Sequence, residues 1–143
     1  MKMAIDRIDW HAESAEKAGL SYENGGTHIG IYLAWIIHNH LEGEDHTEES
    51  TDELELVRTR QMTGRDFLIQ VCDEKFWEDD LNEEAIQFTQ AYYESHDYYK
   101  DYDATLVHPK GLTETYAVAN TWENYDLMAV VIQQRYLAWK NSQ

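Results

Sequence analysis

The chain has 143 residues, of which 43% are hydrophobic and 13% aromatic, which is enough apolar material for one ordinary domain and too much for a disordered chain. Its 28 acidic residues outnumber 11 basic ones and give a net charge of −17, which argues against direct binding to nucleic acid or to an anionic membrane and favours basic protein partners. The same charge is also compatible with a role in solubility alone or with a salt-adapted host.

Signals for export and for membrane insertion are missing from the sequence. The first seven residues lack the apolar core of a signal peptide. The longest strongly apolar stretch, 29–37, is far shorter than the roughly 20 residues that span a membrane. The single cysteine, Cys72, cannot form an internal disulfide. We therefore expect a cytoplasmic protein that has no contact with membranes.

The first strongly periodic segment is a helix over about 28–41. Before it, residues 1–27 look irregular apart from a short helix over 12–18, and the Asn-Gly-Gly run at 24–26 is typical of a turn. Thr27 can cap the helix and Gly43 can end it. Its apolar residues cover a wide arc, so we expect it to be central and nearly surrounded; they are Ile29, Tyr32, Leu33, Trp35, Ile36, Ile37 and Leu41.

Three further helices are predicted from their start signals. Ser50 with Glu53 forms a capping-box pattern, which predicts a helix to about Arg60. Thr63 with Asp66 is a similar start, followed by a helix over about 64–76 that turns Phe67, Leu68, Val71 and Cys72 inward. Asn82 can cap a helix over about 83–95.

The last third of the chain ends in a long predicted helix. The tyrosine-rich segment 98–103 is of uncertain structure, 108–111 is a loop, and 112–119 is either a short strand or an extended lead-in. Asn120 or Thr121 can cap a helix over about 122–140, whose apolar residues repeat at intervals of three and four. We expect an all-α or mainly α fold, a compact bundle of about five helices around the central apolar one, forming a single domain over 1–143.

Motifs for metal binding are weak. His38 and His40 precede several acids, but two residues apart on a helix they point about 200° from each other and cannot easily share one ion. The chain lacks the His-Glu-x-x-His pattern and a cysteine pair. We therefore expect a solvated helix end and no metal ion here.

Motifs for catalysis are equally weak. Cys72 lies on an apolar helix face, where a free cysteine usually behaves as a small hydrophobe. The many acids form no distinctive pair, and they lie in polar runs that would not raise the pKa of a general acid. The segment 24–27 could cradle an anion, but no lysine supports it, and a helix-entry turn explains it better. We expect no cofactor, no catalytic residue and no enzyme activity.

Acidic residues gather in three segments, 42–55, 73–84 and 94–103. Carboxylates on such a surface would steer a basic partner, and the tyrosines of the third segment offer aromatic anchors. The alternative is a charged helical surface with tyrosines half-buried in the core. If a partner binds here, we expect it to contact Asp45, Glu48, Glu49, Asp52, Asp79, Asp80, Asp97, Tyr98, Tyr99, Asp101 and Tyr102.

Motifs at both ends of the chain resemble a known family. They are Asp-Trp-His at 9–11, Glu-Asn-Gly-Gly-Thr-His-Ile-Gly at 23–30 with Leu-Ala-Trp at 33–35, Thr-Trp-Glu-Asn-Tyr-Asp at 121–126, and Arg-Tyr-Leu-Ala-Trp-Lys at 135–140. Together they resemble the start and the end of an uncharacterised bacterial family of small acidic proteins. The resemblance covers the termini but not the acidic middle, and it carries over no catalytic residue.

Small acidic proteins of this type look like the immunity proteins of bacterial toxin–immunity pairs. The resemblance implies a cytoplasmic protein that binds one cognate basic toxin domain, such as a nuclease of a contact-dependent inhibition or type VI system, and covers its active site. Under this interpretation six polar or aromatic residues near the N-terminus have a structural role and fix the N-terminal segment against the central helix: Asp9, Trp10, His11, Asn24, Thr27 and His28. Two alternatives stay open: a metal- or small-ligand-binding protein or enzyme centred on His11 and His28, and a regulatory adaptor without a toxin partner.

Overall fold

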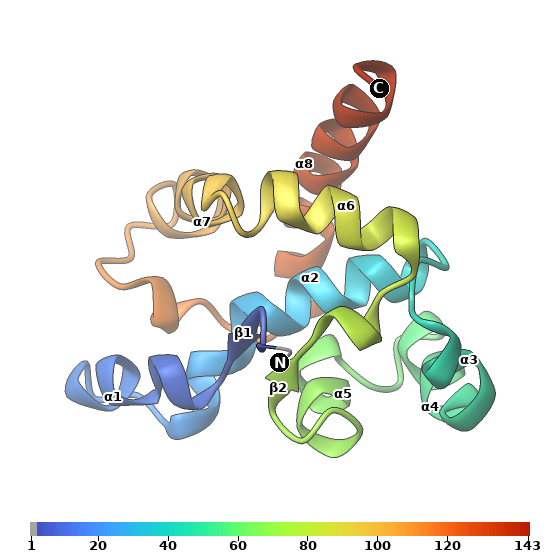
Figure 1. The fold of residues 1–143 in the computed structure, drawn as a ribbon. Helices are drawn as coiled ribbons and strands as arrows, with labels where there is room; N and C mark the ends of the chain where they lie inside the picture. The colour runs from blue at the N-terminus through green and yellow to red at the C-terminus, as the bar shows by residue number, and fades with distance from the viewer. Residues whose placement is uncertain (1–2) are drawn as a thin grey trace.

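The computed structural model describes residues 3–143, which form a mainly α fold with one very small sheet (Figure 1). The expected fold class is confirmed. The described α-helices are α1 (Asp9–Lys17), α2 (Thr27–His38), α3 (Glu44–Glu49), α4 (Thr51–Arg58), α5 (Gly64–Gln70), α6 (Glu83–Tyr92), α7 (Asp97–Tyr102) and α8 (Trp122–Asn141). They are eight rather than about five: α1 is the short helix expected over 12–18, outside the five of the bundle, and the short segments α3 and α7 are also helical.

Helix α2 is the centre of the fold, as its sequence predicts. Every residue from 27 to 37 is buried, which is expected for a helix with apolar side chains on nearly all sides. It packs against α4, α5 and α8, and α6 passes over it in Figure 1. Helix α8 packs on α2, where Trp35 contacts Gln133 and Tyr136, and its last turns project beyond the rest of the molecule (Figure 1).

Helices α2 and α5 touch through two glycines. A Cβ atom added to Gly64 would lie 1.8 Å from the carbonyl oxygen of Gly30, and one added to Gly30 would lie 2.3 Å from the backbone nitrogen of Arg65. Both distances are far below contact distance, so any side chain at either position would force the two backbones apart. This close approach fixes α5 beneath the centre of α2.

Three predicted helix caps are confirmed and two are wrong. The side chains of the N-cap residues accept hydrogen bonds from backbone N–H groups of the first turns of α5, α6 and α8; these residues are Thr63, Asn82 and Thr121. Thr27 instead begins α2 itself, and its hydroxyl accepts a hydrogen bond from Arg65. Ser50 lies between α3 and α4 and makes no side-chain cap.

Several segments end earlier than the sequence pattern suggests. Helix α2 stops at His38, and His40 then adopts a left-handed backbone with φ of 56°, which ends the helix before Gly43. Helix α5 stops at Gln70, so Cys72 lies in the turn that follows and not on the helix. The segment 112–119 is not a strand; it contains a short 3₁₀ turn at Thr115–Ala117.

A two-stranded antiparallel sheet joins the N-terminal segment to the middle of the chain. Strand β1 (Asp6–Arg7) pairs with β2 (Lys75–Phe76), with Asp6 opposite Phe76. The pairing carries Asp6 into the interior, where helices α2, α6 and α7 also supply side chains. None of the described helices is both long enough and apolar enough to cross a lipid bilayer.

Candidate functional site

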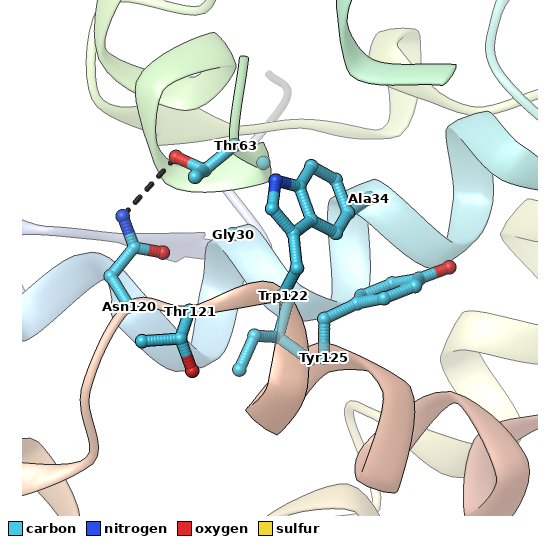
Figure 2. A pocket seen from close by; sticks show the side chains of 9 residues that line it. Gly30, Ala34, Thr63, Asn120, Thr121, Trp122 and Tyr125 are labelled. Carbon is cyan, nitrogen blue, oxygen red and sulfur yellow. Dashed lines mark hydrogen bonds between the residues drawn. The ribbon is translucent and has the colours of Figure 1, made fainter. Parts of the chain in front are cut away.

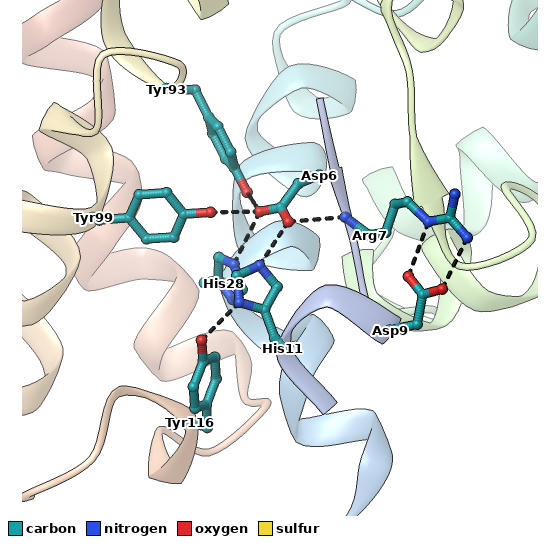
Figure 3. A network of polar contacts seen from close by, with 8 residues as sticks. All are labelled: Asp6, Arg7, Asp9, His11, His28, Tyr93, Tyr99 and Tyr116. Carbon is teal, nitrogen blue, oxygen red and sulfur yellow. Dashed lines mark hydrogen bonds and ion pairs between the residues drawn. The ribbon is translucent and has the colours of Figure 1, made fainter. Parts of the chain in front are cut away.

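A buried carboxylate, Asp6, is the centre of a polar network in the interior of the fold (Figure 3). Its side chain is held by the β1–β2 pairing, and the residue is only 1% exposed. One carboxylate oxygen, Oδ1, accepts a hydrogen bond from the backbone N–H of Arg7 at 2.8 Å and faces Nε2 of His11 at 2.6 Å. On the other side of the ring, Nδ1 of His11 lies 2.7 Å from the hydroxyl of Tyr116.

The second oxygen of Asp6, Oδ2, has three more partners. The hydroxyls of Tyr93 and Tyr99 each donate to it at 2.6 Å, and Nε2 of His28 lies 3.1 Å away (Figure 3). A carboxylate offers about four lone-pair sites, so five donors saturate it. The network therefore ties β1 to α1, α2, α7 and Tyr93, the residue that follows α6, through one side chain.

The charge of Asp6 is stabilised by the histidines around it. Burial alone would raise the pKa of this carboxyl, but hydrogen bonds from His11 and His28 hold the pKa far below its usual range. Burial lowers the pKa of His28, although its hydrogen bond to Asp6 acts in the opposite direction. At neutral pH the ring of His28 is therefore uncharged and donates its Nε2 proton to an ionised Asp6.

This protonation leaves a nitrogen lone pair on His28 without a partner. Its Nδ1 atom is buried and makes no hydrogen bond to any described residue. The hydroxyl of Tyr102, whose ring centroid lies 6.1 Å from that of His28, is also buried and unpaired. Buried polar atoms without partners mark places where a water molecule or a ligand atom belongs. An imidazole oriented by a carboxylate is also the arrangement in which proteins present a lone pair to a metal or a proton.

Two groups of metal-ligand types come together in the part of the chain that the structure describes. They are Asp6 with His11 and His28, and His46 with Cys72 and Asp80; in each group the ligand atoms lie within 4.8 Å of one another. Neither group forms a compact sequence motif, because its members are separated by up to 34 residues and come from different elements. Asp6 in particular gives no signal in the sequence beyond being an acid between Ile5 and Arg7.

Comparison with known proteins places this network inside a family domain. A protein-family model described as "Domain of unknown function (DUF7832)" matches residues 4–118. The chain belongs to this family. No curated protein and no solved structure matches it. The matched range contains the Asp6 network and the motif at 23–30, and it ends before the motif at 121–126.

The predicted partner-binding acids of the first segment lie together on the surface of this domain. Asp45, Glu48, Glu49 and Asp52 are all exposed on α3 and α4, which pack against each other. Arg58, the only Lys or Arg on this helical pair, forms its ion pair elsewhere, with Glu42 at 2.8 Å. We name the acidic face by its seven residues: Glu44, Asp45, Glu48, Glu49, Asp52, Glu53 and Glu55. None of them forms an ion pair with a Lys or Arg within residues 3–143.

The acids of the other two segments are more dispersed, and several of them are paired with a basic residue or buried. Asp79 and Asp97 are exposed, the latter 3.9 Å from Lys100. Asp101 is bound by Arg135 through both oxygens, at 2.9 and 3.0 Å. Asp80 is only 7% exposed, so the interpretation of this residue as a direct partner contact is wrong.

The tyrosines predicted as anchors belong to the core instead. Tyr98 and Tyr102 are 0% and 1% exposed, because they lie one helical turn apart on the face of α7 that packs inward. The Tyr98 hydroxyl donates to the backbone oxygen of His28 at 2.6 Å, and Tyr99 is committed to Asp6. These side chains cannot fill pockets of a partner without unfolding α7, so that part of the prediction is corrected.

A small cavity between α2, α5 and α8 offers no room for a ligand (Figure 2). It measures about 10 Å³ and is lined by Gly30, Thr63, Asn120, Trp122 and Tyr125, among others. That volume is close to the minimum for a single water molecule. Asn120 donates to Thr63 across it at 3.2 Å, so the cavity is a packing feature of the helix junction.

Proposed function

We propose that this protein is a cytoplasmic immunity protein that binds a cognate basic toxin domain through the acidic face on α3 and α4. The observation that supports this is the uneven pairing of its surface charge. Elsewhere on the surface several acids stand next to bases, as in Asp9 with Arg7 at 2.8 Å and Asp126 with Arg60 at 2.6 Å. The acidic face has seven carboxylates within twelve residues and no such partner among residues 3–143.

Uncompensated like charges have a physical cost that a basic partner would remove. Like-charged neighbours three or four residues apart on a helix destabilise it by a few tenths of a kcal/mol per pair. Glu44 with Glu48, Asp45 with Glu49, and Asp52 with Glu55 are such pairs. Lysines or arginines of a partner would turn this repulsion into attraction, and the field of the acidic face would speed their encounter.

A nuclease is the toxin class that fits this surface best. Enzymes that cut RNA or DNA carry basic residues where they hold the phosphate backbone. Carboxylates spaced along two short helices can occupy such a cleft in place of phosphates, and they keep substrate out by charge as well as by volume. A secreted nuclease of a contact-dependent or type VI system is therefore the partner that we infer.

The test is co-expression followed by binding measurements. The toxic product of the adjacent gene should arrest growth when expressed alone and be harmless together with this protein. For the purified pair, neutralising four acids of the acidic face (Asp45→Asn, Glu48→Gln, Glu49→Gln and Asp52→Asn) should lower the association rate about tenfold or more at low salt. The wild-type rate should fall steeply as salt is added.

A matched control distinguishes an effect of the acidic face from an effect of the net charge of the protein. Neutralising four exposed glutamates elsewhere removes the same charge; these are Glu16, Glu83, Glu94 and Glu123, each changed to Gln. When both variants are compared at about 0.15 M salt, where the Debye length is about 8 Å, this combined variant should retain an association rate within about threefold of the wild type, since charges far from the contact are screened. Equal losses in the two variants, or a toxin that is not neutralised at all, would refute the proposal.

A second candidate function is a small-ligand-binding protein or enzyme centred on His11 and His28. The unpaired Nδ1 of His28 and the unpaired hydroxyl of Tyr102 favour it, because both atoms are buried and lack partners. Stoichiometric binding or turnover of a small molecule that is lost in His28→Ala would support it. The same binding should persist in His40→Ala, which alters an exposed histidine outside this network.

A further inference from the structure

Three potential metal ligands from distant parts of the chain converge at the base of α3. Nε2 of His46 lies 2.7 Å from Oδ1 of Asp80, and the sulfur of Cys72 lies 3.6 Å from that oxygen and 3.9 Å from that nitrogen. His46 comes from α3, Cys72 from the turn after α5, and Asp80 from the 3₁₀ turn Glu78–Asp80. His46 and Asp80 are 8% and 7% exposed.

A cysteine–histidine–aspartate set also suggests a nucleophilic triad, but the geometry does not fit one. In such a triad one ring nitrogen faces the nucleophile and the other faces the carboxylate. Here a single nitrogen, Nε2 of His46, faces both Cys72 and Asp80. Burial and the neighbouring Asp80 also raise the pKa of the Cys72 thiol well above its ordinary value, which keeps it protonated and unreactive.

Convergence of one atom from each residue is what a metal ion requires. Just off the plane of the three atoms there is a point roughly 2.0 Å from the nitrogen and the oxygen and about 2.3 Å from the sulfur, which are the usual zinc–ligand distances. At that point the nitrogen and oxygen would be closer together than in a regular tetrahedron, and a small shift of the His46 ring would open the angle. Thiolate, imidazole and carboxylate together suit zinc or a similar divalent transition metal.

The surroundings hold two of these ligands in orientation. The second oxygen of Asp80, Oδ2, accepts the backbone N–H of Trp77 at 2.7 Å, which leaves Oδ1 directed at the other two residues. The ring of Phe67 packs edge-on against His46, with centroids 5.2 Å apart. Such supporting contacts are typical of metal sites. The Asp6 carboxylate is less suitable, because its five donors would have to be displaced first.

We propose that His46, Cys72 and Asp80 form a binding site for a divalent transition-metal ion, with zinc as the preferred metal and water as the fourth ligand. On binding, the Cys72 thiol releases its proton to solvent and its sulfur bonds to the metal. His46 moves its ring proton from Nε2 to Nδ1, so that Nε2 supplies a lone pair, and Asp80 supplies its existing carboxylate charge. The ion would fasten α3, which carries four of the seven residues of the acidic face, to the two turns around β2.

Cobalt(II) is the sharpest probe, because Cys72 is the only cysteine of the chain. A thiolate-to-cobalt charge-transfer band in the near ultraviolet can therefore come from no other residue. We expect the band to saturate at one equivalent in the folded wild type, to disappear when zinc is added, and to be accompanied by release of about one proton per site. Zinc should also raise the melting temperature, by mass action on the native state.

Variants decide whether all three residues take part. Cys72→Ser should abolish the band, and His46→Ala and Asp80→Asn should each weaken cobalt binding at least tenfold. His28→Ala and His40→Ala should leave it unchanged, which separates this site from the Asp6 network. A folded wild type without a charge-transfer band would overturn the proposal. So would a band of equal affinity in His46→Ala and Asp80→Asn, because it would show binding to an isolated thiol.

Discussion

Replacement of Asp6 by asparagine tests the central network most directly. The two side chains have the same shape, but the amide has one acceptor oxygen and one NH₂ group that can only donate. In the native network the donors of His28, Tyr93 and Tyr99 face one carboxylate oxygen, and Arg7 with one histidine face the other. In either amide orientation at least two donors lose their acceptor and meet an NH₂ group instead.

The expected loss of stability is large. A hydrogen bond to a charged group contributes about 1.5–3 kcal/mol, and removing one member of a buried charged network typically costs about 3–5 kcal/mol. We expect Asp6→Asn to lower the free energy of unfolding by an amount in that range. A domain of this size has a total of roughly 5–15 kcal/mol, so the variant should be folded only marginally at room temperature.

Urea unfolding followed by tryptophan fluorescence and circular dichroism would measure this loss. Asp9→Asn is the matched control, because Asp9 lies three residues away, is about half exposed and has only a surface ion pair with Arg7. Its cost should stay within about 1 kcal/mol. If Asp6→Asn cost no more than Asp9→Asn at an unchanged denaturant slope, the carboxylate would not organise the core, and the argument from its five donors would fail.

Two further predictions concern a close backbone contact and a buried imidazole. Gly64→Ala should lower the free energy of unfolding by about 3 kcal/mol or more, since its Cβ would overlap the backbone of Gly30. Gly19→Ala, in open space with φ of 81°, should lower it by about 1 kcal/mol. Similar losses in the two variants would contradict the close backbone contact between Gly64 and Gly30. Burial lowers the pKa of His28, so the unfolded chain takes up its proton first and stability falls as pH decreases below about 6.5. Unfolding at pH 7.5 and 5.5 should show a smaller pH dependence in His28→Asn than in the wild type, whereas His108→Asn, which alters an exposed histidine, should leave it unchanged; the wild-type pH dependence in His28→Asn would argue against the buried neutral ring.

The elements that sequence predicts well are those governed by local interactions. The long helices α2, α6 and α8 are set by apolar spacing, and the starts of α6 and α8 follow from the side chains of Asn82 and Thr121, which bond to backbone groups three residues on. Thr27 and Ser50 form no side-chain caps, but the helix starts predicted from them lie within one residue of the observed starts of α2 and α4. The end of α5 was misplaced because pairing of β2 with β1, a contact across about 70 residues, ended the helix early.

Whether a tyrosine lies in the core or on a binding surface cannot be predicted from the local sequence. Its side chain has an apolar ring and a polar hydroxyl, so a run such as 98–102 fits a binding surface and a core equally well. The choice depends on what lies opposite. Here the backbone oxygen of His28 and the carboxylate of Asp6 accept the hydroxyls of Tyr98 and Tyr99, and both acceptors come from the first 28 residues.

By itself the sequence determined the mainly α class, the central place of α2 and the strongly negative surface, because spacing, capping and charge are properties of the chain at short range. Only the tertiary structure decided which acids remain free on α3 and α4, and which are enclosed with histidines, as Asp6 and Asp80 are. Burial and hydrogen bonding depend on segments that meet only after folding, and these two quantities separate a surface charge from the centre of a site.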